Sequence, residues 1–543
     1  MKKKYILSAA TLAMIMGMTV SCVDDLDVTP KDPSSTMVVD ETALYAKCYA
    51  NMALAGNTGA NGDCDIDGLD GGTTGYVRQL WNANELPTDE AICAWGDPGI
   101  PAFNYNQYDA SHPMLRGFYY RLYVGIDYCN HYLDVCAGVD KTREAEVRFL
   151  RALDYYFLMD CFGNVPFTLE ISATSPKQIS RADLFVWLED ELNDLLPDLL
   201  APRAVKSTDD GYGRVDQDAA NLLLARMYLN AEVYTGSTTR KDENGNDKSI
   251  WDLAKTYAEM VIKGPHVLNT TGMNGWSAYQ MLFMGDNGET TAATEAILPL
   301  LQDGITTTSW GTSLFLMAST WKADMNYNSD YGTTEFWAGN RARRQLLDKF
   351  FPNTDAPNVN YEDMIAAAGD DRAIFFGIDR NLDVATPTEY TDGFAVAKFR
   401  NTYASGKAPH HSQFVDMDFF LMRSAEAYLI YAEAEARTNG GVTGSKGTDY
   451  VNAIRNRANT STQTQYSLSQ ILDERAREFY FEGYRRTDLI RYGLYGGENS
   501  GSYLWQWKGG AENGTSFAAT RNVFAIPDED MNANPNLTQN PGY

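Results

Sequence analysis

The chain has 543 residues, of which 44% are hydrophobic and 12% aromatic, and its formal net charge is −27 at pH 7. This length allows three or four average domains or one large helical domain, and the composition is that of a globular protein. The strong acidity argues against nucleic acid as a partner, because a polyanion would be repelled, and it favours a neutral ligand.

The N-terminus has the order of a secretory signal. Three lysines precede an apolar run from Tyr5 to about Val20, and small residues follow before Cys22. The run is too short and too close to the N-terminus to favour a membrane span in the mature protein. We therefore predict a signal peptide over residues 1–21 and, after it, a polar tether over residues 22–40.

The segment TVSC, residues 19–22, resembles a loose lipobox, in which the cysteine is acylated after cleavage. Acyl chains on Cys22 would hold the protein at a membrane, since each buried methylene contributes ~0.8 kcal/mol. An ordinary cleavage site followed by a chance cysteine is the alternative. The six further cysteines show neither a CxxC pair nor the spacing of a small disulfide scaffold, so we predict packed thiols.

The body of the chain has the apolar spacing of amphipathic helices. Residues 145–163 place apolar side chains at steps of three and four and end at Gly163. Residues 216–236 and 251–264 form one predicted helix pair, and residues 420–441 and 449–461 form another.

Small alanines at Ala225 and Ala258 are typical of tetratricopeptide-like hairpins, in which they let two helices approach closely. We predict a mainly α fold in a single domain over 41–543. Its predicted parts are a helical scaffold over about 115–265 and 418–492 and a loop-rich binding region over about 60–110 and 268–415.

Residues 474–493, ERAREFYFEGYRRTDLIRYG, alternate in charge near helical spacing. This pattern predicts ion pairs along and between helices. Catalysis by the clustered carboxylates is the rival interpretation, but a charge-rich helical stripe needs no substrate to explain it.

Five segments together resemble the signature blocks of the SusD/RagB family: AEVRFLRALDYYFLMDCFGNVPF, LMRSAEAYLIYAEAEART, NAIRNRAN, ILDERAREFYFEGYRRTDLIRYG and FAIPDEDMNANPNLTQNPGY. The resemblance runs in order along almost the whole mature chain. It implies a SusD-like fold in an outer-membrane lipoprotein at the cell surface that binds glycans beside a SusC-like TonB-dependent transporter. The acidic cluster VDDLD after Cys22 is similar to the surface-export signal of some Gram-negative lipoproteins.

Further blocks, including GTTEFW and YLWQWKGGAENGTS, are similar to the starch-binding prototype of the family. That resemblance implies that starch or malto-oligosaccharides are the ligand. The starch-site residues it implies are the aromatics Trp95, Trp310 and Trp337 and the polar partners Asp70, Arg78 and Asp97. Trp310 stands where the prototype has a tyrosine, and the loop after Trp95 is shorter than in the prototype, so it offers only Asp97 or Pro98.

The segments FMGDNGE and FVDMDF resemble stretches that hold calcium in the same prototype. This resemblance implies a structural Ca²⁺ held by the Gly288 carbonyl, Asp416 and Asp418, with Asp286 nearby, and the ion would stiffen the ligand loops. Solvated loop acids are the alternative. No catalytic cofactor is implied.

The sequence also permits two other classes of function. A glycoside hydrolase needs two carboxylates across the sugar, and Glu85, Asp89 and Glu90 are the candidates. The chain contains no GxSxG, HExxH or P-loop motif. A protein-interaction scaffold would use the helix pairs but leaves the loop tryptophans unexplained. We predict a non-enzymatic binding protein for α-1,4-glucans, with a different glycan as the alternative ligand.

Overall fold

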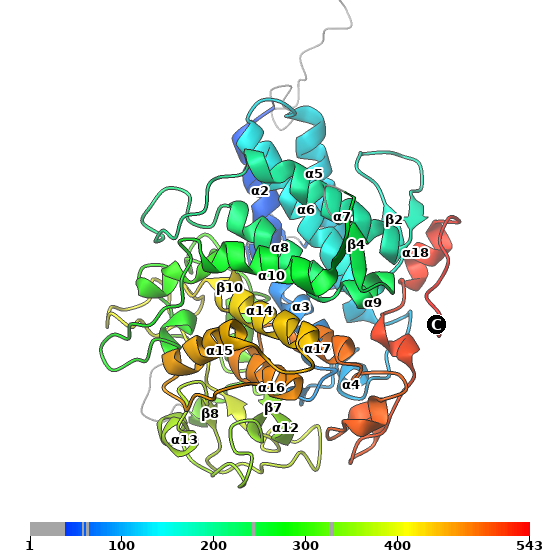
Figure 1. Ribbon diagram of the computed structural model, residues 1–543. Helices are drawn as coiled ribbons and strands as arrows, with labels where there is room; N and C mark the ends of the chain where they lie inside the picture. Colours follow the sequence, from blue (N-terminus) through cyan, green and yellow to red (C-terminus); the bar gives the residue numbers. More distant parts are fainter. Residues whose placement is uncertain (1–38, 57–58, 61–63, 242–244, 326–330) are drawn as a thin grey trace, which may run out of the picture. The chain divides into compact units, whose positions relative to one another are not determined.

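Helices dominate the computed structural model, which describes residues 39–56, 59–60, 64–241, 245–325 and 331–543. Within these residues the strands form five two-stranded antiparallel sheets. The mainly α fold class is confirmed (Figure 1). The chain divides after Ala43, and everything described below, apart from the first three residues of α2 (Glu41–Ala53), lies in the compact unit Leu44–Tyr543. The predicted signal peptide, Cys22 and most of the tether lie outside the described residues.

The first helical layer contains α5 (Pro113–Val135), α6 (Lys141–Phe162) and α7 (Arg181–Leu195). Helix α6 begins at an Asp140 cap, whose carboxylate accepts from the backbone N–H groups of Thr142 and Arg143. It ends at Gly163, where φ is 72°, a left-handed conformation that glycine adopts without steric cost. The predicted glycine stop is therefore confirmed.

The second layer contains α8 (Gln217–Leu229), α10 (Ile250–Ile262), α14 (Ala425–Thr438) and α15 (Ser445–Arg457), and α10 packs between α8 and α14 (Figure 1). Ala225 and Ala258 are fully buried there. Both predicted helix pairs form. The contact between α10 and α14 closes the scaffold although the long insert separates them in sequence.

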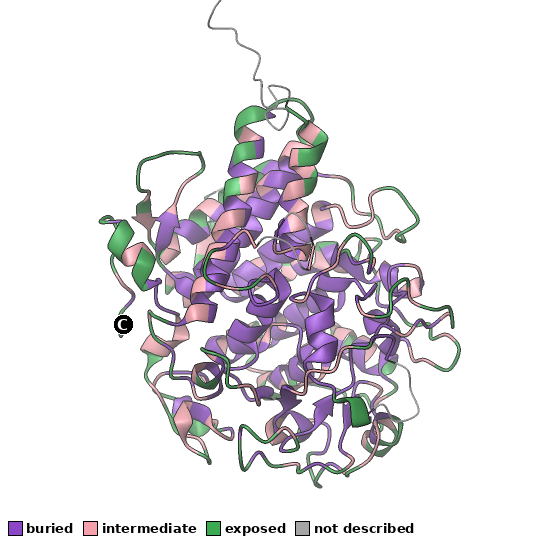
Figure 2. Cartoon of the chain, turned by 180° about the vertical axis from the view of Figure 1, so that it is seen from behind, coloured by how far each residue is buried: buried purple, intermediate pink, exposed green. Residues whose placement is uncertain are grey.

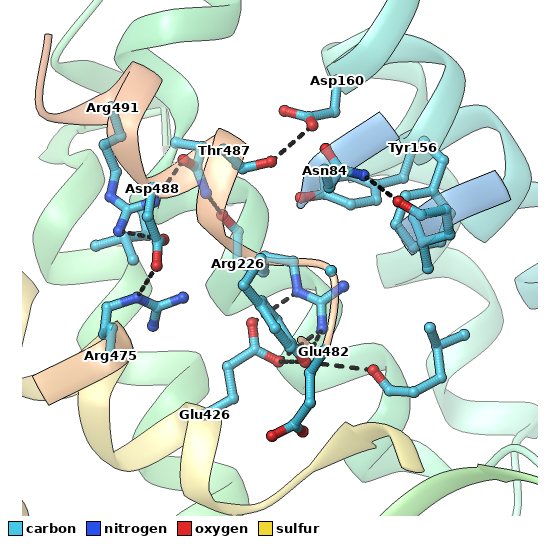
Figure 3. A pocket seen from close by; sticks show the side chains of 17 residues that line it. Asn84, Tyr156, Asp160, Arg226, Glu426, Arg475, Glu482, Thr487, Asp488 and Arg491 are labelled. Atoms are coloured by element: carbon cyan, nitrogen blue, oxygen red, sulfur yellow. Dashed lines mark hydrogen bonds and ion pairs between the residues drawn. The ribbon is translucent and has the colours of Figure 1, made fainter. Parts of the chain in front are cut away.

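The predicted charge stripe becomes α16 (Leu468–Phe479) and α17 (Arg485–Arg491). Its ion pairs form, but they are buried. Glu478 is fully buried and accepts from Arg423 at 2.6 Å, from Arg372 at 3.3 Å and from Arg457. Figure 3 shows a neighbouring buried cavity, in which Arg226 donates to both oxygens of Glu426 at 2.7 and 2.6 Å.

Two small sheets hold the loop-rich insert, residues about 268–415, in place. Strand β6 (Ala296–Leu300) pairs with β10 (Phe419–Arg423), which leads into α14. Strand β1 (Ala91–Cys93) pairs with β7 (Asn340–Ala342), with Ala91 opposite Ala342. This second sheet brings together the two loop-rich regions that the sequence separates by about 250 residues, and residues just beyond its end carry two of the predicted site tryptophans.

The remaining helices are α2 (Glu41–Ala53), α3 (Tyr76–Asn84), α4 (Ile100–Asn104), α9 (Ala231–Thr235), α11 (Ser313–Ala318), α12 (Arg344–Leu347), α13 (Tyr361–Ala368) and α18 (Asp528–Ala533). The remaining strand pairs are β2 (Val165–Phe167) with β3 (Lys177–Ile179), β4 (Thr239–Lys241) with β5 (Asp247–Ser249), and β8 (Phe375–Phe376) with β9 (Ala395–Val396). The short 3-10 helices are η2 (Leu196–Asp198), η3 (Gln280–Phe283), η4 (Thr291–Thr294), η5 (Ala323–Met325), η6 (Ser500–Ser502), η7 (Lys508–Gly510) and η8 (Ala519–Asn522).

Buried residues fill the central helices and inner strands, whereas exposed residues gather on the outer loops, on the outer ends of some helices and on α18 (Figure 2). Across the described ranges, no helix is long and apolar enough to cross a membrane. The six described cysteines are free thiols, and five of them are buried, as the packed-thiol interpretation predicts.

Candidate functional site

Trp95, Trp310 and Trp337 come from three separate loops and lie side by side. The ring centres of Trp95 and Trp337 are 6.4 Å apart with an interplanar angle of 52°. Those of Trp310 and Trp337 are 6.2 Å apart at 53°. All three indoles are partly buried and pack against the main hydrophobic core. Trp337 is thus the centre of a group of tilted rings, which we call the aromatic arc.

Trp95 rests on a glycine. A methyl group at Gly339 would lie 2.2 Å from Trp95 Cε2, so only glycine leaves room for the indole there. The Trp95 indole N–H donates to the Trp337 carbonyl at 3.0 Å, and its ring lies 6.4 Å from that of Phe315. The Trp95 indole therefore has a fixed position, although the residue lies in an irregular loop.

The other two indoles are held in the same way. Trp310 Nε1 donates to the Ala60 carbonyl at 3.1 Å, and its ring lies 4.9 Å from that of Phe414. Trp337 Nε1 donates to Glu335 at 2.7 Å. Because each polar edge is satisfied by the protein, the rings are oriented without a ligand.

Arg78, in the first turn of α3, and Asp70, on the segment that leads into this helix, lie beside the arc. The Arg78 guanidinium carbon is 5.6 Å from the centre of the Trp95 ring, close enough for a cation–π contact. Arg78 is 8% exposed, and its Nε has no hydrogen-bond partner among the described residues. Burial lowers the pKa of Arg78, although the charges of Asp70 and Asp97 act in the opposite direction. The guanidinium thus places a positive charge next to the rings.

Asp70 is exposed and is oriented by Thr73, whose backbone N–H and hydroxyl donate to its carboxylate at 2.9 and 2.6 Å. Partial burial alone would raise the pKa of Asp70, but the Thr73 hydrogen bonds and the Arg78 charge lower it, so the carboxylate is ionised at neutral pH. Asp97 is exposed in the turn after Trp95, and its charge also acts on Arg78.

Two polar residues at the arc were not predicted from the sequence. Glu335 accepts from the Trp337 indole through one oxygen and from the Gln413 side-chain amide at 2.8 Å through the other. Glu335 belongs to the GTTEFW block, and its position two residues before Trp337 was an available signal. Gln413 has no such signal, because it reaches the arc from a segment 76 residues further along the chain.

The carboxylates that suggested a hydrolase are buried. Asp89 is fully buried and forms a two-point ion pair with Arg485, at 2.7 and 2.8 Å. Burial would raise the pKa of Asp89, but the Arg485 charge outweighs it and holds the pKa below its usual range. Burial raises the pKa of Glu85 and that of Glu90, the latter to about 7. These groups join the loop-rich region of residues 60–110 to α17 and the turn before it, and they do not face a surface ligand.

The residues of the predicted calcium site have protein partners. Asp418 accepts from Tyr212 at 2.7 Å and from the Gln302 N–H at 2.8 Å, Asp286 accepts from two backbone N–H groups, and Asp416 accepts from His410. The Gly288 carbonyl accepts from the Ser207 N–H at 2.8 Å. Among the residues that the structure describes, no group of three or more His, Cys, Asp or Glu side chains could hold a metal ion. The geometry therefore gives the calcium prediction no support.

Comparison with known proteins assigns the chain to a family. The SusD family model matches residues 233–543. The starch-binding protein SusD of Bacteroides thetaiotaomicron is 37% identical over 584 aligned residues that cover 100% of both chains. The chain belongs to the SusD family. The family membership that the sequence resemblance implied is therefore confirmed.

Solved structures of the SusD superfamily share the fold. A protein from Parabacteroides distasonis has a TM-score of 0.64 at 20% identity and covers 93% of this chain and 98% of its own. Surface glycan-binding protein A of Bacteroides thetaiotaomicron, solved with laminarihexaose, has a TM-score of 0.63 at 18% identity and covers 92% of this chain and 98% of its own. The SusD-like fold is therefore confirmed for this chain.

Proposed function

We propose that this protein captures starch and malto-oligosaccharides at the cell surface without cleaving them. The observation that carries the proposal is the aromatic arc, in which the ring centres of Trp95 and Trp310 lie 6.4 and 6.2 Å from that of Trp337. The full-length similarity to a starch-binding protein supports the same ligand class.

The arc suits a sugar chain for a physical reason. One face of a glucose ring presents axial C–H groups, and a flat indole gains dispersion and buried area against them while the hydroxyl rim stays hydrated. The successive tilts of 52° and 53° give a bent surface. An α-1,4-linked glucan is itself bent and helical, whereas a β-1,4-linked glucan is straight, so the shape favours starch fragments.

Polar groups at the rim would fix the register of the sugar. The Arg78 guanidinium lies beside Trp95, Asp70 offers an ionised carboxylate, and Glu335 offers side-chain oxygens that can accept further hydrogen bonds. Asp97 adds a carboxylate at the outer edge. Each such hydrogen bond contributes only ~1 kcal/mol, because it replaces a bond to water. A shallow site of this kind should bind with a Kd on the order of micromolar to millimolar.

Capture would serve import. Acylation at Cys22 would anchor the protein in the outer membrane at the cell surface, where a SusC-like TonB-dependent transporter receives the glucan. Holding the sugar over the transporter raises its local concentration and so increases the frequency of transfer. The family membership supports this arrangement.

Isothermal titration with maltoheptaose tests the proposal. Trp337→Ala should weaken binding by about tenfold or more, because it removes the central ring and with it ~1.4 kcal/mol or more. Its thermal midpoint should stay close to that of the wild type. Trp251→Ala, which changes a partly buried tryptophan on α10, is the matched control and should bind normally.

Three outcomes would overturn the proposal. Unchanged maltoheptaose binding by Trp337→Ala would exclude the arc as the binding site. Shortening of maltoheptaose during incubation would indicate a hydrolase. Tighter binding of laminarihexaose than of maltoheptaose would identify a β-1,3-glucan as the ligand, in line with the complex known for a structural relative.

A further inference from the structure

Trp507 differs from the nine other tryptophans, all of which lie in the described part of the chain. Trp81, Trp321 and Trp505 are buried in core clusters, and six more are partly buried against the main core. Trp507 is partly exposed and belongs to neither group. Its ring instead pairs with that of Tyr105, with centres 5.8 Å apart and an angle of 56°. Packing of the core does not explain its position.

The backbone of Trp507 is held in a rare conformation. Its φ is 69°, in the left-handed region that residues with a side chain seldom adopt. The Trp507 N–H donates to the Glu512 carbonyl at 3.2 Å, and its own carbonyl accepts from the Gly510 N–H at 3.0 Å. The surrounding loop therefore imposes this conformation and projects the indole from a tight turn.

The indole is oriented as those of the aromatic arc are. Trp507 Nε1 donates to the Val384 carbonyl at 2.7 Å. The three arc tryptophans likewise have their indole N–H groups bound to the protein. By contrast, the indole nitrogens of the three fully buried tryptophans have no hydrogen-bond partner in the described structure. Trp507 and the arc tryptophans thus share two features: each ring is partly exposed, and each indole N–H is bonded to the protein.

A single buried arginine positions both rings of the pair. Arg343 is fully buried, and its guanidinium donates to the carbonyls of Asn104 and Gln506, the residues immediately before Tyr105 and Trp507. The side chain of Asn104 in turn binds both backbone groups of Cys93, at 3.0 and 2.8 Å. Cys93 is the last residue of β1, two residues before Trp95, so the pair is coupled through these contacts to the strand that leads to Trp95.

We propose that Tyr105 and Trp507 form an auxiliary platform that binds the pyranose rings of a glucan whose chain extends beyond the aromatic arc. Gln107 lies beside the platform, since a methyl group at Gly510 would be 2.4 Å from its amide nitrogen, and Gln107 and Glu512 are exposed. These amide and carboxylate groups can meet hydroxyls while the rings meet C–H faces. The platform rests on the proposed function, because it needs a glucan held at the arc.

The two sites together should favour long chains. A glucan that touches both binds the second site as an intramolecular event at high effective concentration, whereas a short oligosaccharide reaches only one site. Loss of the platform should therefore weaken binding of a polymer and leave binding of maltotriose unchanged.

The test uses Trp507→Gly and Tyr105→Ala in the full mature protein. Glycine adopts a positive φ readily, so Trp507→Gly removes the ring while keeping the turn. Tyr105→Phe keeps the ring and is the matched control. Retardation in native gels that contain amylopectin measures polymer binding, and titration calorimetry with maltotriose measures the arc alone.

We expect Trp507→Gly and Tyr105→Ala to weaken amylopectin binding by about threefold or more, with maltotriose binding and the thermal midpoint unchanged and Tyr105→Phe like the wild type. Wild-type retardation of both ring-deletion variants would overturn the platform, as would equal losses for polymer and maltotriose. If Trp507→Gly is unstable, the amylopectin and maltotriose measurements on Tyr105→Ala decide whether the platform binds glucan. Trp337→Ala distinguishes the two proposals, because failure of the arc removes maltotriose binding as well.

Discussion

The charged helices α16 and α17 and the tryptophan-bearing loops reverse the usual distribution of side chains. Glu474, Glu478 and Arg485 are buried, although charged residues are seldom inside a protein. Trp95, Trp310 and Trp337 reach the surface, although large aromatics usually complete a core. In both regions the exception is stable because every unusual group has a specific partner.

The two regions use those partners differently. In the scaffold, charges meet opposite charges, so that removing one leaves another buried and uncompensated. In the arc, the indole edges meet carbonyls or a carboxylate and one ring rests on a glycine, while part of each ring stays available. Changes in the first region should therefore affect stability, and changes in the second should affect affinity.

The largest effect should come from Arg423→Met. Arg423 is fully buried and contacts Glu295, Glu478 and Glu482 at 2.6 to 2.9 Å. Its loss should lower the free energy of unfolding by about 3–5 kcal/mol, because the carboxylates lose a buried partner. Urea denaturation at pH 7 measures the change.

Arg344→Met is the matched control for that experiment. Arg344 also contacts several aspartates, but its partners Asp355 and Asp383 are exposed, so the loss should stay below about 1 kcal/mol. Equal losses for the two variants would contradict the distinction between buried and surface pairs. Both folded proteins should bind maltoheptaose normally.

Gly339→Ala should separate affinity from stability. The added methyl would lie 2.2 Å from the Trp95 ring and would displace it, so glucan affinity should fall by about tenfold, or ~1.4 kcal/mol. Gly96→Ala, on the loop of Trp95 itself, is the control, because a methyl group there has no neighbour within 4 Å. If Gly339→Ala and the wild type have equal glucan affinities in calorimetry, the position of the Trp95 ring does not matter for binding.

The Glu85–Glu90 pair should make stability depend on pH. Burial raises the pKa of both groups in the folded protein, that of Glu90 to about 7, so the folded state holds a proton that the unfolded chain releases. Folded stability should therefore fall as pH rises from about 5 to 8.

Glu85→Gln mimics the protonated acid and can still accept from the Gly483 and Tyr484 N–H groups. It should gain about 1 kcal/mol relative to the wild type at pH 8 and show little difference at pH 5. Thermal midpoints at the two pH values measure this. A loss of stability at both values would contradict the shared proton.

The smallest effect should come from salt. A neutral glucan releases no counterions, so raising NaCl from about 50 to 500 mM should change maltoheptaose affinity by less than about twofold. Titrations at the two concentrations give the comparison. A steep fall would mean that Asp70 and Arg78 meet a charged ligand.

The helices could be predicted because their signals are local. Residues 145–163 contain both the apolar spacing and the glycine stop, and α6 ends at the predicted position. The predicted ion pairs of α16 and α17 also form, but the sequence did not indicate that they are buried. Burial depends on what packs outside a helix, and here Arg372, Arg423 and Arg457 arrive from distant segments.

The candidate site was predicted from family resemblance, and periodicity alone would not have found it. Glu335 had a signal beside Trp337, whereas Gln413 had none, because contacts across loops leave no repeating pattern. The role of the six predicted ligand residues stays a prediction, and so do the domain limits and the lipid anchor at Cys22.

The sequence by itself determined the helices and the family, since short-range spacing and signature blocks are properties of the chain alone; that polyanions do not bind stays a prediction from its acidity. Only the tertiary structure decided that three indoles from separate loops come together, that Glu85, Asp89 and Glu90 lie inside, and that Trp507 stands apart from the core. The pairing of β1 with β7 brings the loops of Trp95 and Trp337 together, and the bond from the Arg78 N–H to the Gly311 carbonyl holds the loop of Trp310, because a few long-range backbone hydrogen bonds set where irregular loops meet.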